Sequence, residues 1–221
     1  MFAVLFEVHP KSNQWDTYLG FAGMLKPELE QIDGFVDNIR YRSLTRDGWL
    51  LSLSNWRDEK AVVRWRTTIR HHEIQGEARA NVFLDYHLRV GQLTHDTQIP
   101  EGYTLREQRL DETEVGEATT VSLIDTRAMT EVTSVPPADV AGRLGLRPAA
   151  DGLVEWDVFD AVLTPGDVML MLSWRDEQAA RSFEAAGLPG KARIRRVRII
   201  RDYGMFDRRE APQYYPDVRR T

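Results

Sequence analysis

The sequence of 221 residues contains no cysteine. Disulfide bonds, thiolate metal sites and cysteine nucleophiles are therefore excluded. A chain without disulfides suits a reducing compartment, and we predict a cytoplasmic protein. No apolar run approaches the roughly 20 residues that a helix needs to cross a bilayer, and the first residues lack the basic segment of a signal peptide. We therefore expect no membrane partner.

An excess of positive charge is also missing, because the formal net charge is −5. A chain without a general positive field does not fit the pattern of nucleic-acid-binding proteins. The one local basic run, from Lys191 to Arg198, alternates with apolar residues. This alternation is typical of a strand whose charged face meets solvent. We expect no nucleic-acid partner.

Motifs for metals and common cofactors are absent as well. The sequence holds no glycine-rich dinucleotide or phosphate loop, no serine nucleophile elbow and no HExxH zinc motif. Its five histidines show no metal-ligand spacing. We therefore predict no metal site and no bound cofactor.

The most informative feature that is present is an internal repeat. WRDEKAVVRW begins at Trp56, and WRDEQAARSF begins at Trp174. At an offset of 118 residues, segment 33–66 aligns with segment 151–184 without a gap. This period is too long for a solenoid repeat and has the length of a small domain. The chain is therefore predicted to carry a duplicated domain.

Both copies predict the same order of secondary-structure elements. In the first copy, Ala61, Trp65 and Ile69 share one helix face at a spacing of four. The first copy predicts strands at 3–8, 35–44, 49–55 and 83–90, with helices at 15–32 and after Trp56. The second predicts strands at 120–124, 154–163, 168–173 and 194–200, with helices at 138–144 and after Trp174. The order βαββαβ is that of a ferredoxin-like unit.

The repeated WRDE motif is predicted to be a structural corner where a helix begins. We expect Ser54 or Asn55 to cap the first of these helices, and Ser173 with Asp176 to form a capping box for the second. Two acidic residues near the helix start suit the positive end of the helix dipole. The repetition therefore indicates a conserved corner and not a catalytic motif.

The predicted fold class is α+β, with two ferredoxin-like βαββαβ domains. We place the first domain at 1–93 and a polar linker at 94–117. The second, diverged domain is placed at 118–203, and a carboxy-terminal tail at 204–221. The tail is rich in aromatic residues and proline.

The stretch WRDEKAVVRWR, followed by HHEIQGEARANVFLDYHLRV, resembles the antibiotic biosynthesis monooxygenase family of the dimeric α/β-barrel superfamily. The resemblance is clearest from Phe35 to Val90. It implies an antiparallel sheet with helices on one face, whose other face is closed by a second unit, usually in a homodimer. This chain carries both units, so we expect an intrachain pseudo-dimer that forms one barrel. Tethering gives the halves an effective concentration on the order of millimolar, which favours this pairing over a homodimer of the whole chain.

The resemblance also implies a monooxygenase. We expect cofactor-independent oxidation of a small aromatic or apolar substrate by O2, with the deprotonated substrate supplying the electron. Such a reaction needs an apolar cavity and a few polar groups. Trp65, Phe35 and Tyr86 are the candidate substrate-binding residues, and His71 and His72 are the candidate catalytic base or donor. Adjacent helical residues point about 100° apart, so at most one of these histidines faces a cavity.

Three other functions remain open. In a haem-binding or haem-degrading oxygenase, Trp65 would match the family pattern. However, His71 and His72 come early for an axial ligand, and the first strand offers Glu7 where such relatives have asparagine. Isomerase or decarboxylase-like chemistry is a further possibility for this barrel. The fourth is a non-catalytic small-molecule-binding or stress-response module.

The two copies differ near these candidate residues. Phe183 replaces Trp65, and the second helix is cut short by Gly187 and Pro189, so nothing corresponds to His71. One hypothesis is that only the amino-terminal half holds a working pocket. The other is that the second copy has drifted as a purely structural element.

Overall fold

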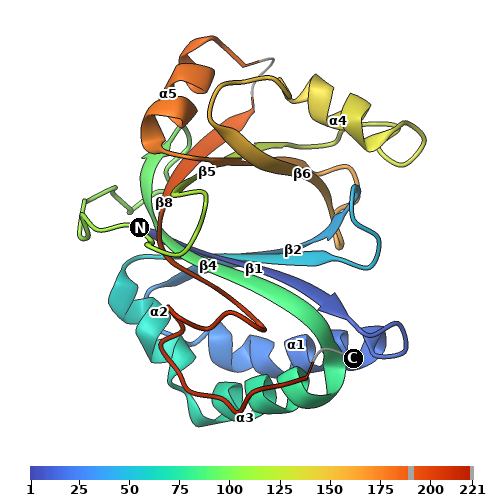
Figure 1. Cartoon of the computed structure of the whole chain (residues 1–221), viewed down its shortest axis with the longest axis vertical. Helices are drawn as coiled ribbons and strands as arrows, with labels where there is room; N and C mark the ends of the chain where they lie inside the picture. Colours follow the sequence, from blue (N-terminus) through green and yellow to red (C-terminus); the bar gives the residue numbers. More distant parts are fainter. Residues whose placement is uncertain (189–191, 220–221) are drawn as a thin grey trace.

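The computed structural model describes residues 1–188 and 192–219, and its strands form one closed barrel (Figure 1). Helices cover the outside of the barrel. The elements follow in chain order as β1 (Phe2–Pro10), α1 (Trp15–Leu29), β2 (Phe35–Ser43), β3 (Leu50–Trp56), α2 (Glu59–Arg66), α3 (Ile69–Glu77), a short π-helical turn (Ala78–Val82), β4 (Phe83–Asp96), β5 (Thr120–Thr126), α4 (Pro137–Arg143), β6 (Leu153–Ala161), β7 (Val168–Trp174), α5 (Glu177–Ala185) and β8 (Arg193–Gly204).

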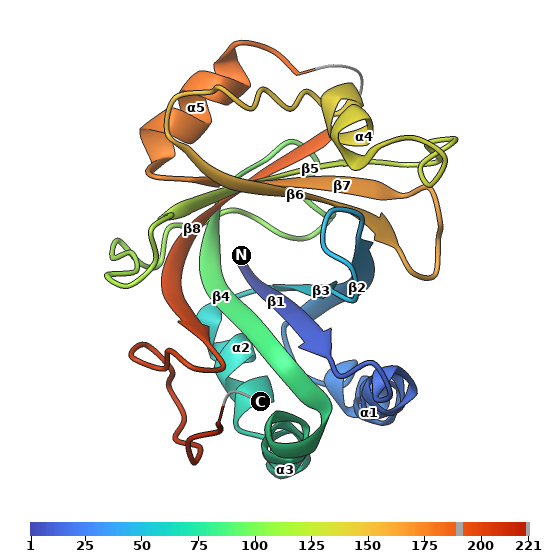
Figure 2. The same ribbon diagram turned by 45° about the vertical axis from the view of Figure 1, so that its right-hand side comes forward.

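The barrel is built from two equivalent sheets of four antiparallel strands. The strand order around it is β1-β3-β2-β6-β7-β5-β8-β4. The sheets join at two seams, where β4 pairs with β8 over most of its length and β2 pairs with β6 only from Tyr41 to Ser43. Helices α1 to α3 lie on the opposite side of the barrel from α4 and α5 (Figures 1 and 2). The prediction of two ferredoxin-like units closing one intrachain α/β barrel is confirmed.

Apolar side chains fill the interior of this barrel. The buried cluster receives residues from all eight strands, among them Leu5, Leu53, Leu123, Phe159 and Ile199, each at most 1% exposed. Because successive strand residues point to opposite faces, the alternate residues of these strands point outward, toward the helices. The space between each sheet and its helices is therefore lined by these outward-pointing side chains.

The repeated WRDE corner has the same geometry in both halves. Asp58 accepts a hydrogen bond from the backbone N–H of Ala61, and Asp176 does so from Ala179, both at 2.8 Å. These aspartates are the helix N-caps. The predicted caps at Ser54, Asn55 and Ser173 were wrong, because those residues still belong to the preceding strands.

A glycine just before each second strand explains why Asp-Gly recurs in the repeat. Gly34 and Gly152 both have positive φ, at +93° and +76°. A Cβ atom there would lie 2.7 Å from the Ala61 Cβ in one half and 2.5 Å from the Ala179 Cβ in the other. Only glycine combines this backbone conformation with so close a packing of strand and helix.

Two other local predictions need correction. Ile69 does not continue the face of Ala61 and Trp65, because α2 ends at Arg66 and Ile69 begins a new helix with 79% of its surface exposed. The predicted basic strand is present as β8. Its arginines do not form a solvent face, since Arg195 and Arg196 are buried and paired with acidic residues. Lys191 of that run lies outside the described residues.

The helices of residues 1–188 and 192–219 are all too short or too polar to span a membrane.

Candidate active site

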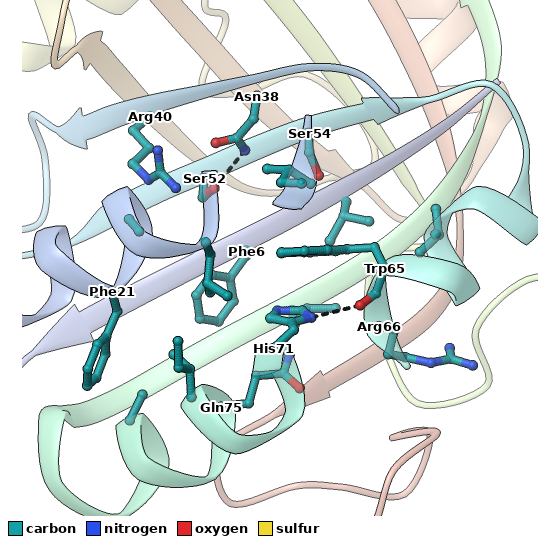
Figure 3. Close-up of a pocket in the computed structure, with 18 of the residues that line it drawn as sticks. Phe6, Phe21, Asn38, Arg40, Ser52, Ser54, Trp65, Arg66, His71 and Gln75 are labelled. Atoms are coloured by element: carbon teal, nitrogen blue, oxygen red, sulfur yellow. Dashed lines mark hydrogen bonds between the residues drawn. The ribbon is translucent and has the colours of Figure 1, made fainter. Parts of the chain in front are cut away.

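A cavity of about 170 Å³ lies between the amino-terminal sheet and helices α1 to α3 (Figure 3). The sheet forms its floor and the helices form its walls. Most of its lining is apolar or aromatic, and no aspartate or glutamate belongs to that lining. The wall residues include Tyr18, Phe21, Leu25, Leu29, Val62, Trp65, His71, Ile74, Gln75 and Phe83.

The floor consists of two rows of residues that cross all four strands of the amino-terminal sheet. The first row is Asn38, Ser54, Val4 and Val90, and the second is Arg40, Ser52, Phe6 and Leu88. In both rows the residues on β2 and β3 are polar and those on β1 and β4 are apolar. The floor therefore changes from polar to apolar across the sheet, which suits an amphipathic ligand.

The polar end of the floor is partly organised by its own hydrogen bonds. The Asn38 side-chain amide donates to the Ser52 hydroxyl at 2.9 Å and to the Leu53 carbonyl at 3.3 Å. The Trp56 indole N–H donates to the Ser54 hydroxyl at 2.9 Å. Ser52 and Ser54 thus each accept one hydrogen bond and retain an O–H group that can be donated to a ligand.

Trp65 and His71 face one another on the helix side of the cavity, across from Ser54 of the floor (Figure 3). Their rings stack with centroids 4.2 Å apart and an angle of 19° between the planes. His71 Nδ1 lies 3.2 Å from the Trp65 carbonyl oxygen. A carbonyl only accepts, so Nδ1 carries the hydrogen and Nε2 retains a free lone pair.

The break between α2 and α3 is what brings His71 back over Trp65. The hydroxyls of Thr67 and Thr68 donate to the carbonyls of Val63 and Trp65, at 2.9 and 3.0 Å. These hydrogen bonds end α2. Threonine favours such local bonds over a continuous helix. His71 then sits on the first turn of α3, with its ring against the indole.

Burial lowers the pKa of His71 to about 4, from an ordinary value of 6.5. The cause is the loss of water around the charged form, with the Trp65 carbonyl acting weakly in the opposite direction. At neutral pH the imidazole is therefore uncharged. A neutral ring with a free Nε2 is able to accept a proton from a ligand in the cavity.

His72 points away from the cavity, as the 100° step along a helix implies. Its side chain is exposed to solvent and stacks on Tyr215 of the carboxy-terminal tail, with ring centroids 4.9 Å apart. Its Nδ1 lies 2.9 Å from the Tyr215 hydroxyl. His72 thus holds the tail against α3 and does not reach the cavity.

Phe35 and Tyr86 also lie outside the cavity lining. Phe35 packs edge-on against Trp56, at a centroid distance of 5.3 Å. The Tyr86 ring is buried behind Phe6, 5.7 Å away, and its hydroxyl accepts hydrogen bonds from Arg79 and Arg208. Of the five candidate residues named from the sequence, the structure brings only Trp65 and His71 to the cavity.

Asn38, Arg40 and Ser52 were missed by the sequence analysis. The signal that was available is the repeat itself. At the offset of 118 residues, these three positions correspond to Trp156, Val158 and Leu170, so polar residues in one copy stand where the other has apolar ones. Such a replacement on the covered face of a strand indicates a site.

The described residues contain no group of three histidine, aspartate or glutamate side chains placed to hold a metal ion. The cavity also fits haem poorly. Glu7, the residue on the first strand, lies on the barrel side of the sheet, where its carboxylate is 2.6 Å from Arg89. The first strand presents only Val4 and Phe6 to the cavity, so it offers no polar side chain that could assist a haem.

Comparison with known proteins identifies the family. No family model matches the chain. A protein of Pyricularia oryzae named jasmonate monooxygenase ABM is 50% identical over 222 residues, which covers 98% of this chain and 99% of that protein. The chain belongs to the antibiotic biosynthesis monooxygenase family. The predicted family and its monooxygenase activity are thereby confirmed, and the relative matches both halves of this two-domain monooxygenase.

A solved structure shows that the tandem arrangement occurs elsewhere. The crystal structure of an aldoxime dehydratase matches this monooxygenase with a TM-score of 0.53 and a sequence identity of 12%. The match covers 90% of the monooxygenase and 81% of the dehydratase chain. At this identity the likeness concerns the fold alone.

Proposed function

We propose that this monooxygenase oxidises a jasmonate-like substrate in the cavity beneath α1 to α3, without a bound cofactor. The observation that carries the proposal is the neutral His71, stacked on Trp65, across from a floor that runs from polar to apolar. The name of the Pyricularia oryzae relative supports the substrate class. Jasmonate is a cyclopentanone with a carboxymethyl arm and a pentenyl arm, so it is a small ketone with one polar and one apolar end.

The chemistry begins with loss of a proton next to the ketone. His71 Nε2 accepts this proton, and the hydroxyls of Ser52 or Ser54 donate hydrogen bonds to the enolate oxygen. The low pKa of His71 makes it a weak base in the empty cavity. An enolate beside the ring raises that pKa, because opposite charges stabilise one another at low dielectric. The protein thus provides a base and an oxyanion site from its own side chains.

The oxidation that follows needs no external reductant. The enolate transfers one electron to O2, and the resulting radical pair forms a carbon–oxygen bond and hence a peroxide. Loss of water then leaves one oxygen atom as a carbonyl, so that CH2 and O2 give C=O and H2O. If the product is an alcohol instead, two further electrons and two protons are required from a reductant. This difference makes cofactor independence testable.

The test combines oxygen uptake with product analysis. Purified protein is supplied with jasmonic acid, with its methyl ester and with an anthrone, each with and without reduced nicotinamide. We expect oxygen uptake without the reductant, insensitivity to a chelator, and one atom from labelled dioxygen in the product. A requirement for reductant would overturn cofactor independence. Ligand binding without any oxygen uptake would support the non-catalytic binding module instead.

Matched histidine variants test the proposed base. His71→Ala is expected to lower the rate on the order of 100-fold or more, since positioned bases contribute at least that much. His72→Ala, one position along the same helix, serves as the control and is expected to retain the rate. Equal loss in both variants would indicate damage to α3 and not loss of a base.

We also propose that the protein acts as a monomeric pseudo-dimer in the cytoplasm. The closed strand order leaves no free edge in the barrel that a second copy would have to cover. Light scattering of the purified protein tests this, and a homodimer mass would contradict it.

A further inference from the structure

Arg40 is the charged residue of the cavity floor. It lies on β2, opposite Ser52 on β3, and its side chain points into the space between the sheet and α1 (Figure 3). Phe21 of α1 and Phe6 of β1 border the same space. A guanidinium group thus stands among aromatic rings at the polar end of the cavity.

No anion in the described part of the chain neutralises this charge. In the part of the chain that the structure describes, Arg40 has no carboxylate within ion-pair distance, and its half-buried side chain leaves Nε without a hydrogen-bond partner. Its side chain hydrogen-bonds the Tyr18 hydroxyl, which is uncharged because burial raises the pKa of Tyr18. Two fully buried arginines are paired with carboxylates, Arg89 with Glu7 and Arg195 with Asp125. Buried Arg79 instead donates to the neutral oxygens of Tyr86, Met205 and Pro216.

An unpaired, partly buried guanidinium costs stability, because it has lost water without gaining a counter-charge. The fold itself does not require a charge at this position. The equivalent residue in the second half is Val158, which is fully buried in an apolar core opposite Leu170. Arg40 therefore has a role that the frame of the domain does not explain.

We propose that Arg40 binds the carboxylate of the substrate, so that this monooxygenase is specific for small, mostly apolar carboxylic acids in their anionic form. The inference rests on the cavity of the proposed function and names its substrate class. A guanidinium binds a carboxylate through two parallel hydrogen bonds. With the carboxylate at Arg40, the body of the ligand lies over Phe6 and Leu88 and extends toward the ring pair of Trp65 and His71.

Arg66 is the other arginine of the lining, and it is the rival anchor. Its Nε is also buried without a partner. However, Arg66 lies at the end of α2, and its guanidinium points away from His71 and the cavity (Figure 3). Arg66→Gln is therefore included in the test. Loss of carboxylate binding in this variant alone would identify Arg66 as the anchor.

The experiment measures binding by calorimetry, independently of turnover. The probes are jasmonic acid and 1-naphthylacetic acid, each compared with its methyl ester, which has the same body without the charge. Wild-type protein is expected to bind the acids on the order of 10- to 100-fold more tightly than the esters, the range for a hydrogen-bonded charge. Arg40→Met is expected to remove this preference while leaving ester affinity and the melting temperature unchanged or raised.

Two further variants complete the test. Arg42→Met changes an exposed arginine two residues along β2 and is expected to keep the preference for acids, whereas Arg40→Lys keeps the charge without the fork and is expected to retain part of it. A wild-type protein without acid preference, an Arg40→Met protein that keeps it, or its loss in Arg66→Gln alone would each overturn the proposal. Acid preference without oxygen uptake would contradict the proposed function and leave the role of Arg40 standing.

Discussion

The two halves of the barrel share a frame and differ in what lies between sheet and helices. In the amino-terminal half, the helix-facing positions of β2 and β3 are Asn38, Arg40, Ser52 and Ser54. At the same register in the second half stand Trp156, Val158, Leu170 and Leu172. These side chains belong to an apolar cluster and fill the space that is open in the first half. The cavity thus arises from polar residues at positions where the fold accepts large apolar ones.

The helices differ in the same sense. The first helix has 15 residues in the amino-terminal half and 7 in the second, where α4 packs closely on the sheet. Trp65 is half-buried and stacks on His71, whereas Phe183 is buried against Trp174 at a centroid distance of 4.9 Å. One half has a dense core, and the other has a cavity in the place of part of that packing. This trade of stability for function is common at active sites.

The strongest way to break the comparison is to exchange one facing pair between the halves. Arg40→Val with Ser52→Leu copies the pair Val158 and Leu170 into the first half. We expect ligand binding to fall on the order of 100-fold or more, and stability to rise by about 1 kcal/mol or more as apolar area replaces an unpaired charge. Calorimetry and thermal melts measure the two effects. Destabilisation of this double variant would show that the two floors are not equivalent.

The reverse exchange tests the second half. Val158→Arg places a charge in a fully buried apolar core that holds no partner for it at that position. We expect a loss of stability of about 3–5 kcal/mol, in the range for an uncompensated buried charge, and no new ligand site. Denaturant unfolding measures this change. A mild effect would mean that the core of the second half also tolerates an arginine at this position.

His71 sharpens the comparison through pH, because the second half has no equivalent residue. Its pKa of about 4 in the folded protein lies below the ordinary 6.5, so the unfolded chain binds the extra proton between these values. Its contribution to stability is therefore complete above about pH 6.5 and falls as the pH drops toward 4, by an amount on the order of 3 kcal/mol.

Unfolding of wild type and His71→Phe between pH 4 and 7.5 measures this slope, with the exposed His72→Phe as control. His71→Phe should lose part of the slope and His72→Phe should keep it. An unchanged slope in His71→Phe would show that the pKa of His71 is the same in the folded and the unfolded chain.

Exchange of the two helix aromatics gives a smaller effect. Phe183→Trp overfills the second core and is expected to cost about 1–3 kcal/mol without creating activity. Trp65→Phe keeps a large aromatic ring and is expected to cost only about 1 kcal/mol while weakening ligand binding or turnover more clearly. Melting curves and ligand titration on both variants decide between core and cavity roles. A strong fall in melting temperature with unchanged binding would identify Trp65 as core.

The smallest effect is expected at the tail, which has no counterpart at the end of the first half. Tyr215→Phe removes hydroxyl contacts to His72 and Gln75 but keeps the stacked ring. We expect a loss of about 0.5–1.5 kcal/mol, the net value of a hydrogen bond, with little change in turnover. Hydrogen exchange of α3 measures the loosening. A large loss of activity would mean that the tail positions His71 through its neighbour.

The sequence alone determined the frame of this protein. A gapless repeat, period-two strands and the paired WRDE corners were enough to predict two βαββαβ units, because these signals are local or periodic. The closure of the two units within one chain was implied by the family resemblance together with the repeat. They also placed Trp65 and His71 near a common site. The caps were misplaced by a few residues, since a serine or asparagine at a strand end has the same chemistry as a true cap.

Only the tertiary structure decided where the site lies and which polar residues belong to it. Alternation shows that Asn38 and Arg40 share a face of β2, but not whether that face meets the barrel interior or the helices. Because of the same ambiguity, Tyr86 was wrongly predicted to bind substrate, and the arginines of β8 were wrongly predicted to face solvent. Whether an arginine is paired depends on partners far away in the chain, as with Arg195 and Asp125, and such contacts exist only once the strands are assembled into the barrel.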